Sequence, residues 1–159
     1  MEEQHQRHEE RVRSSTSSEK NRKIDRETIE NIKKYENKSP AGIEERIEAL
    51  EKEWDIERLL ETNMSTLALI GIALTIFVHE YWIILPIIVL SFFLQHALQG
   101  WCPPLPIFRS MGKKTRAELD REKYALKILK GDFDEVPRSG DPLNAEKIYK
   151  ATTKNKISI

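Results

Sequence analysis

The sequence predicts an all-α membrane protein, in which a two-helix transmembrane hairpin is flanked by cytoplasmic amphipathic helices and disordered tails. The chain is 33% charged, yet the block between Glu61 and Arg109 holds a single formal charge, Glu80. That block contains two apolar stretches, each with the roughly 17–25 residues that a helix needs to cross a hydrocarbon layer of about 30 Å. The polar flanks have too little apolar material for a large water-soluble core, so an independent enzyme domain is not expected.

The amino-acid composition argues against nucleic acid as a partner and against an intramolecular disulfide. The 159 residues hold 26 Lys+Arg and 26 Asp+Glu, and a chain with no basic excess is not expected to bind nucleic acid. Cys102 is the only cysteine, so no intramolecular disulfide is possible. We expect the lipid bilayer as a partner, and neither a cofactor nor a metal ion.

Residues 1–38 are predicted to be a disordered polar tail. They are rich in charge and include a Ser/Thr patch from Ser14 to Ser18. Such a segment buries too little apolar surface to offset the entropy of ordering it. Isolated apolar residues near Ile24 and Ile29 predict at most a weak helix.

Residues 39–61 are predicted to form a juxtamembrane amphipathic helix. Ser39 can cap it and Pro40 suits its first turn. A narrow apolar stripe repeats at helical spacing: Ile43, Ile47, Leu50 and Trp54. The stripe predicts a self-association seam in a homo-oligomer such as a dimer, with contact to the membrane surface as the alternative. No helix-ending signal precedes Asn63, so this helix is expected to continue into the first span.

Residues 62–101 are predicted to be the transmembrane hairpin, with helices at about 62–79 and 81–99. Pro86 predicts a kink or an accommodated break in the second helix. Small and polar residues predict the faces on which the two helices approach each other. These are Ala68, Gly71 and Thr75 in the first helix, and Ser91 and Gln95 in the second.

The distribution of Lys and Arg predicts the orientation. The connection between the two spans has none, whereas both flanks carry several: Arg46, Lys52 and Arg58 on one side, and Arg109, Lys113, Lys114, Arg116 and Arg121 on the other. The positive-inside rule therefore predicts a multi-pass protein with both termini in the cytoplasm.

Beyond the hairpin, residues 102–114 are predicted to be an extended, proline-rich exit, because Pro103, Pro104 and Pro106 oppose a continuing helix. Residues 115–131 are predicted to form a second amphipathic helix, which packs on the stripe or lies on the headgroups. Thr115 and Glu118 make a capping-box pattern at its start, and Gly131 suits its end. Residues 132–159 are predicted to be a polar tail.

The block QHALQGWCPPLPIFRSMG, followed by TRAELDREKYALKILKGDF, resembles the YgaP-like inner-membrane family of bacteria. The upstream segment LEKEWDIERLLE resembles the part that precedes the membrane hairpin in longer relatives. The resemblance implies a two-helix transmembrane domain, self-association and a location in the bacterial inner membrane. In the better-known members this domain is fused to a rhodanese with a cysteine nucleophile. This chain has no such domain and no second cysteine, so sulfurtransferase activity is not implied.

Cys102, Trp101 and His96 are the candidate functional residues. Cationic neighbours lower the pKa of a thiol, so a reactive Cys102 is one interpretation, and haem ligation by Cys102 beside His96 is another. The interpretation that we favour is packing of Cys102 and Trp101 at the membrane boundary. His96, Gln95, Gln99 and Asn63 are expected to share one depth, where hydrogen bonding between helices is favoured over an ion site.

The sequence thus predicts a small, non-enzymatic inner-membrane protein that anchors helices able to pair with themselves or with an unidentified membrane or cytoplasmic protein. One alternative is a thiol- or sulfur-handling accessory that acts through Cys102. Another is a subunit of an oligomeric channel or transporter, because two spans alone cannot enclose a pathway.

Overall fold

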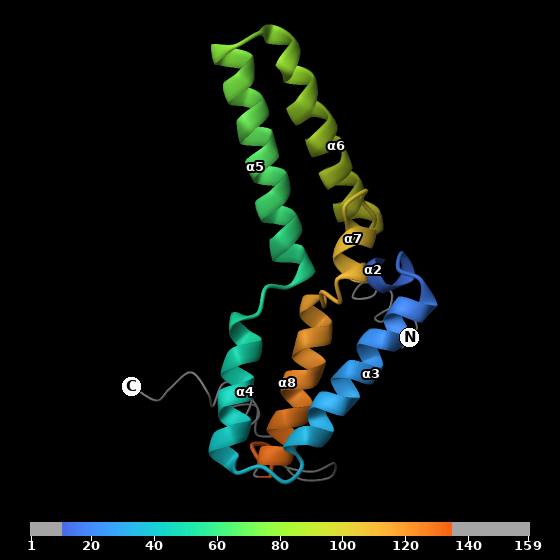
Figure 1. The fold of residues 1–159 in the computed structure, drawn as a ribbon, viewed down its shortest axis with the longest axis vertical. Coiled ribbons are helices and arrows are strands. Elements are labelled where there is room, and N and C mark those ends of the chain that lie inside the picture. Colours follow the sequence, from blue (N-terminus) through green and yellow to red (C-terminus); the bar gives the residue numbers. More distant parts are fainter. Residues whose placement is uncertain (1–10, 135–159) are drawn as a thin grey trace, which may run out of the picture. The chain divides into compact units, whose positions relative to one another are not determined.

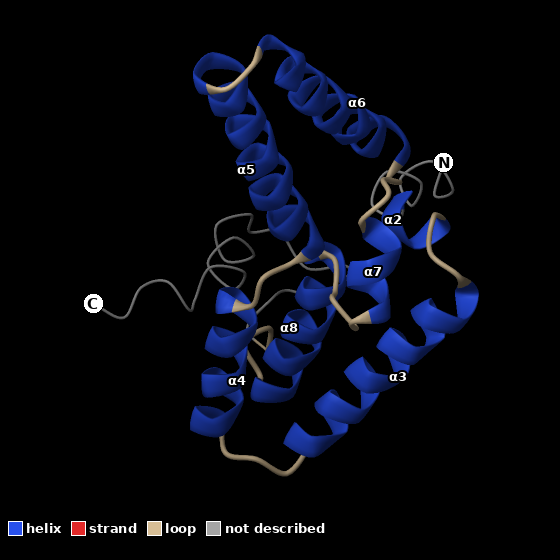
Figure 2. Ribbon diagram, turned by 45° about the horizontal axis from the view of Figure 1, so that its top comes forward, coloured by secondary structure: helices blue, strands red, loops and turns tan. Residues whose placement is uncertain are grey.

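The computed structural model describes residues 11–134, and these form helices and connecting turns without any strand (Figure 2). The predicted all-α class is therefore confirmed for this part of the chain. Two of its helices are long and apolar enough to cross a membrane. The described elements, in chain order, are α2 (Arg11–Ser14), α3 (Ser18–Tyr35), α4 (Pro40–Lys52), α5 (Ile56–Phe77), the 3-10 helix η1 (Glu80–Ile83), α6 (Ile84–Gln99), α7 (Leu105–Ser110) and α8 (Arg116–Lys130).

The chain divides into two compact units. Of the described residues, the first contains 11–28 and 53–119, and the second contains 29–52 and 120–134. Helices α3 and α8 contribute to both units. The predictions for residues 1–10 and 135–159 fall outside the described residues.

Within the first unit, α5 and α6 run antiparallel and are joined through η1 (Figure 1). Helix α5 begins at Ile56 because the Asp55 carboxylate caps it, accepting a hydrogen bond from the Arg58 N–H at 2.7 Å. This cap separates α4 from α5, so the expected continuous helix from residue 39 into the first span is wrong. The sequence does contain a signal for this helix start, because Asp55 is of a residue type that commonly caps the N-terminus of a helix.

Helix α6 begins and ends at residues whose backbone chemistry suits those positions. Pro86 lies in the first turn, where its missing N–H removes no intrahelical bond, so no kink is required. Gly100 ends α6 in the left-handed conformation at φ 73°, and its N–H donates to the His96 carbonyl at 2.7 Å.

The α5–α6 contact depends on a small residue facing a proline. Ala68 and Gly71 are buried and Thr75 is half-buried, so α5 presents these small residues toward its partner. A Cβ atom on Gly71 would lie 2.5 Å from Pro86 Cδ. On α6 the buried residues are Pro86 and Val89, whereas Ser91 is exposed and Gln95 half-buried. The prediction that Ser91 lies on the contact face is wrong, because Ser91 is two positions, or about 200° of helix, from Val89.

Gly71→Ala is expected to lower the thermal unfolding temperature of the protein in detergent micelles. The proline ring is rigid, so the added methyl group must push the helices apart, at a cost of about 1–3 kcal/mol. Gly42→Ala is the matched control, since its Cβ would be 3.6 Å from the nearest atom, Ser39 Oγ, and alanine favours helix by about 1 kcal/mol. A Gly71→Ala protein as stable as the Gly42→Ala protein would contradict this packing.

The segment predicted to be a disordered tail differs from that prediction over most of its described length. Residues Ser18–Tyr35 form α3, with Ile24 only 1% exposed. Composition alone does not predict this helix, because it is stabilised by neighbours that are distant in sequence. Asn21 and Lys20 hydrogen-bond to residues 106–110, which are more than 80 positions away.

The proline-rich exit is also partly helical. Pro104 immediately precedes α7 and Pro106 lies in its first turn, where proline is compatible with a helix. The prediction of an extended exit over 102–114 is therefore wrong for Leu105–Ser110. The predicted capping box of the following helix is present: Glu118 N–H donates to Thr115 Oγ1 at 3.2 Å, and Thr115 N–H donates to a Glu118 carboxylate oxygen at 2.9 Å.

In the second unit, α8 lies beside α4. Three ion pairs join them: Arg46–Glu122 at 2.6 Å, Lys123–Glu51 at 3.9 Å, and Lys130–Glu44. Of the predicted self-association stripe, Ile43, Ile47 and Leu50 are at most 3% exposed, while Trp54 is 43% exposed. The stripe is thus covered within the chain and does not offer a free seam to a second copy. The alternative, that residues 115–131 pack on it, describes this arrangement better.

Candidate functional site

The outer faces of α5 and α6 are covered with large apolar side chains that remain exposed within the described residues 11–134. In the most apolar 18-residue stretch of each of the two segments, only 22% and 11% of the residues, respectively, are buried. The core helix of a soluble protein would be mostly buried. The exposed residues include Leu69, Ile70, Ile72, Ile76, Phe77, Ile84, Ile87, Ile88, Leu90, Leu94 and Leu98. A continuous apolar surface of this kind marks a contact with lipid or with another protein.

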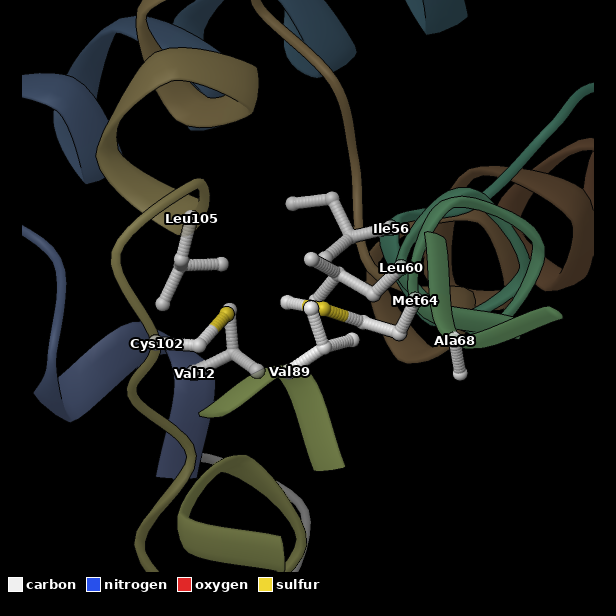
Figure 3. Close-up of a cluster of buried hydrophobic side chains, with 8 residues drawn as sticks. All are labelled: Val12, Ile56, Leu60, Met64, Ala68, Val89, Cys102 and Leu105. Carbon is white, nitrogen blue, oxygen red and sulfur yellow. The ribbon is translucent and has the colours of Figure 1, made fainter. Parts of the chain in front are cut away.

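The apolar core of the first unit lies at the open end of the helix pair, away from η1. Figure 3 shows Val12, Cys102 and Leu105 facing side chains of α5, with Val89 of α6 between them. The α5 residues in this cluster recur every four positions: Ile56, Leu60, Met64 and Ala68. The core therefore ties α2, α5, α6 and the start of α7 into one body.

Cys102 belongs to this core. Cys102 is fully buried, and this burial raises the pKa of its thiol. A hydrogen bond with the backbone of Leu105 lowers the pKa, but by less. A buried, protonated thiol is a poor nucleophile, so this environment favours packing over thiol chemistry. Trp101 next to it is 37% exposed.

The polar residues expected to gather at one depth are only partly brought together. Gln95 and Gln99 form a long hydrogen bond of 3.5 Å along α6. Nδ1 of His96 is buried and has no hydrogen-bond partner among the described residues. Asn63 instead lines an apolar groove of about 360 Å³, together with Leu67, Phe92, Pro104 and Ile107. No shared ion site of these four residues is formed.

A buried ion pair lies at the junction of α7 and α8, and sequence reasoning missed it. The Arg109 side chain is 0% exposed and the Glu118 side chain 3% exposed. The two make a bidentate pair, with nitrogen–oxygen distances of 2.7 and 3.0 Å. The sequence signal was the spacing of an Arg nine residues before a capping-box Glu, which does not by itself indicate burial.

Three further side chains, all from the N-terminal segment, complete this network. Arg13 donates to Glu118 at 2.6 Å and forms a second bidentate pair with Asp25, at 2.9 and 2.8 Å. Asn21 accepts a hydrogen bond of 2.6 Å from Arg109. Two arginines and two carboxylates thus balance in charge, and they join α2, α3, α7 and α8 within the first unit. Such balance offsets the cost of removing each charge from water.

The described residues 11–134 contain no group of three or more His, Cys, Asp or Glu side chains placed to hold a metal ion. Comparisons of the chain with protein-family models, with curated proteins and with solved structures find no match.

Proposed function

We propose that this protein is a non-enzymatic membrane anchor, in which α5 and α6 cross the bilayer as a hairpin and hold the other helices at one face. The observation that carries the proposal is the exposed apolar surface of α5 and α6. The helical segments suit a bilayer in length, because the 22 residues of α5 extend about 33 Å and the hydrocarbon layer is about 30 Å thick. The residues of Glu80–Gln99 form a second segment of similar length.

The ends of the two helices support the same arrangement. Tyr81 and Trp82 lie at the connection, 73% and 44% exposed, and aromatic residues are enriched at membrane–water boundaries. At the other end, Trp54 precedes α5 and Trp101 follows α6. No Lys or Arg occurs between Arg58 and Arg109, whereas both flanks of the hairpin carry several, so we place the flanked end in the cytoplasm together with both termini. The resemblance noted from the sequence makes the bacterial inner membrane the proposed location.

The helices outside the membrane would bind a partner, which is either a second copy of the chain or another protein. Because the α4 stripe is covered by the chain itself, a dimer would have to use another surface. The burial of Cys102 gives the thiol-handling alternative no support.

An arginine substitution tests whether the exposed apolar faces meet lipid. Ile70→Arg places a charge near the middle of α5, and insertion then becomes less favourable by about 2.5–3.5 kcal/mol. We expect the wild-type protein to stay in membranes washed with alkaline carbonate, and the Ile70→Arg protein to be partly extracted or degraded. Its fraction in the washed pellet, measured by immunoblot, is the readout.

Ile128→Arg is the matched control, because Ile128 of α8 is 66% exposed and Ile70 46% exposed. If the protein were soluble, arginine would be tolerated at both positions. Equal behaviour of the two variants in the carbonate wash would contradict the anchor.

A further inference from the structure

A cleft of about 560 Å³ lies in the first unit between the N-terminal half of α3 and the segment from Arg109 to Gly112. Its volume is within the range of small-molecule sites, about 300–1,000 Å³. Its wall is strongly cationic. Five of the residues that line it are basic (Lys20, Arg22, Lys23, Arg26 and Arg109), and one is acidic (Glu19).

Several of these cations form no ion pair with a carboxylate among residues 11–134. Lys20 Nζ donates to two neutral oxygens, Ser110 Oγ at 2.6 Å and Pro106 O at 3.2 Å, which hold it in place. Arg22 and Arg26 are exposed and form no ion pair with any residue of the described range. Lys23 reaches Glu27 only at 3.9 Å.

Arg109 is a buried residue that also lines the cleft. The two terminal nitrogens of Arg109 donate hydrogen bonds to Glu118, Asn21 and the Lys113 carbonyl. Its Nε is buried without a partner among the described residues. Ser17, one residue before the start of α3, also lines the cleft, so the N-terminal end of this 18-residue helix adds its partial positive charge.

We infer that this cleft binds a phosphate group, supplied by the headgroup of an anionic lipid or by a soluble phosphate compound. Clustered Lys and Arg beside a helix N-terminus match the charge of phosphate and supply its hydrogen-bond donors. The placement favours the lipid source, because α7 begins six residues after the last residue of α6 and Lys20 contacts its Pro106 carbonyl. This preference for the lipid source rests on the proposed membrane anchor, whereas the cleft itself does not.

The test is carried out on the full chain, purified in a neutral detergent. Binding of dioctanoyl phosphatidylglycerol is measured by native mass spectrometry, with inorganic phosphate as a second probe at constant ionic strength. Arg22→Gln combined with Arg26→Gln is expected to weaken binding about 30-fold, because each cation near an anionic surface contributes about 1 kcal/mol. Lys33→Gln combined with Lys34→Gln removes two exposed cations from the same helix outside the cleft and is expected to leave the affinity within about twofold.

Binding that is weakened only by the Arg22/Arg26 substitutions supports the site. Competition by inorganic phosphate then indicates a free phosphate ligand, and lipid binding without competition indicates a headgroup. Equal affinity in both double variants, or no binding of either probe, overturns the inference. Because detergent-solubilised protein is used, a failed carbonate test of the anchor does not alter these outcomes.

Discussion

Replacing Glu118 by glutamine is expected to lower the free energy of unfolding of the first unit by about 3–5 kcal/mol. Glutamine keeps the size of the side chain and can still accept the capping hydrogen bond from Thr115 N–H. It removes the negative charge that balances Arg109, whose side chain is 0% exposed. The loss therefore measures the cost of leaving a buried guanidinium unpaired. Thermal or denaturant unfolding in micelles, followed by circular dichroism, gives the value.

Glu48→Gln is the control for this substitution. Glu48 is 61% exposed and lies 3.9 Å from Lys52, and such surface pairs contribute at most about 1 kcal/mol. If Glu118→Gln were no more destabilising than Glu48→Gln, the buried network would not be a source of stability.

The effect of Glu118 should also depend on pH in a defined direction. Burial alone raises the pKa of its carboxyl group, but the hydrogen bonds that it accepts from two arginines and a backbone N–H outweigh burial and hold the pKa below its ordinary value of 4.5. Its contribution is then fully present above about pH 4.5 and is lost as the pH falls through the lower, folded-state pKa. The stability difference between wild type and Glu118→Gln should shrink between pH 6 and pH 3.

Gly100→Ala is the second substitution with a large expected effect. Gly100 has a φ of 73°, and its Cβ would lie 2.5 Å from the Arg11 carbonyl carbon and 2.7 Å from the carbonyl oxygen. The left-handed conformation costs alanine about 1–2 kcal/mol, and the contact with backbone atoms adds about 1–3 kcal/mol. We expect a loss of about 2–5 kcal/mol and release of α2 from the end of α6, where the Arg11 side chain donates to the Ala97 carbonyl at 2.6 Å.

Gly112→Ala separates the cost of the left-handed conformation from the cost of the contact with backbone atoms. Gly112 has a similar φ of 77°, but a Cβ there meets only the end of the Glu27 side chain, at 4.0 Å. It should show the conformational cost alone. Equal unfolding temperatures for the two variants would contradict the close approach of α2 to Gly100. Faster proteolysis of residues 11–17 in the Gly100→Ala protein would support it.

The parts of the fold that were predictable from the sequence are those fixed by local patterns. The two long apolar segments show directly in the residue types, and the cap of α8 shows in the spacing of Thr115 and Glu118. Gly100 and Gly131 both adopt positive φ at helix ends, and an end at Gly131 was expected from its position. In each case the controlling interaction lies within a few residues along the chain.

The parts that were not predictable depend on contacts between distant segments. The Ser18–Tyr35 segment is polar enough to be disordered alone, and it becomes α3 where Asn21 and Lys20 meet residues of the α7 segment. Arg109 lies in a charged segment that is typical of a solvated flank. It is nevertheless buried, because Glu118 and Asn21 accept hydrogen bonds from its guanidinium group. The contact face of α6 is not marked by small polar residues: Pro86, which fits the space left by Gly71, and Val89 are its buried residues, whereas Ser91 is exposed.

The hairpin across the bilayer is the central claim, and cysteine labelling in oriented vesicles tests it most directly. Single cysteines replace Glu48, Tyr81 or Arg121 in a Cys102→Ser background, and all three positions are exposed. A membrane-impermeant maleimide is applied to right-side-out and to inverted inner-membrane vesicles. The account predicts that position 81 is labelled only in right-side-out vesicles, and positions 48 and 121 only in inverted ones. Labelling of all three positions from the same side would contradict it.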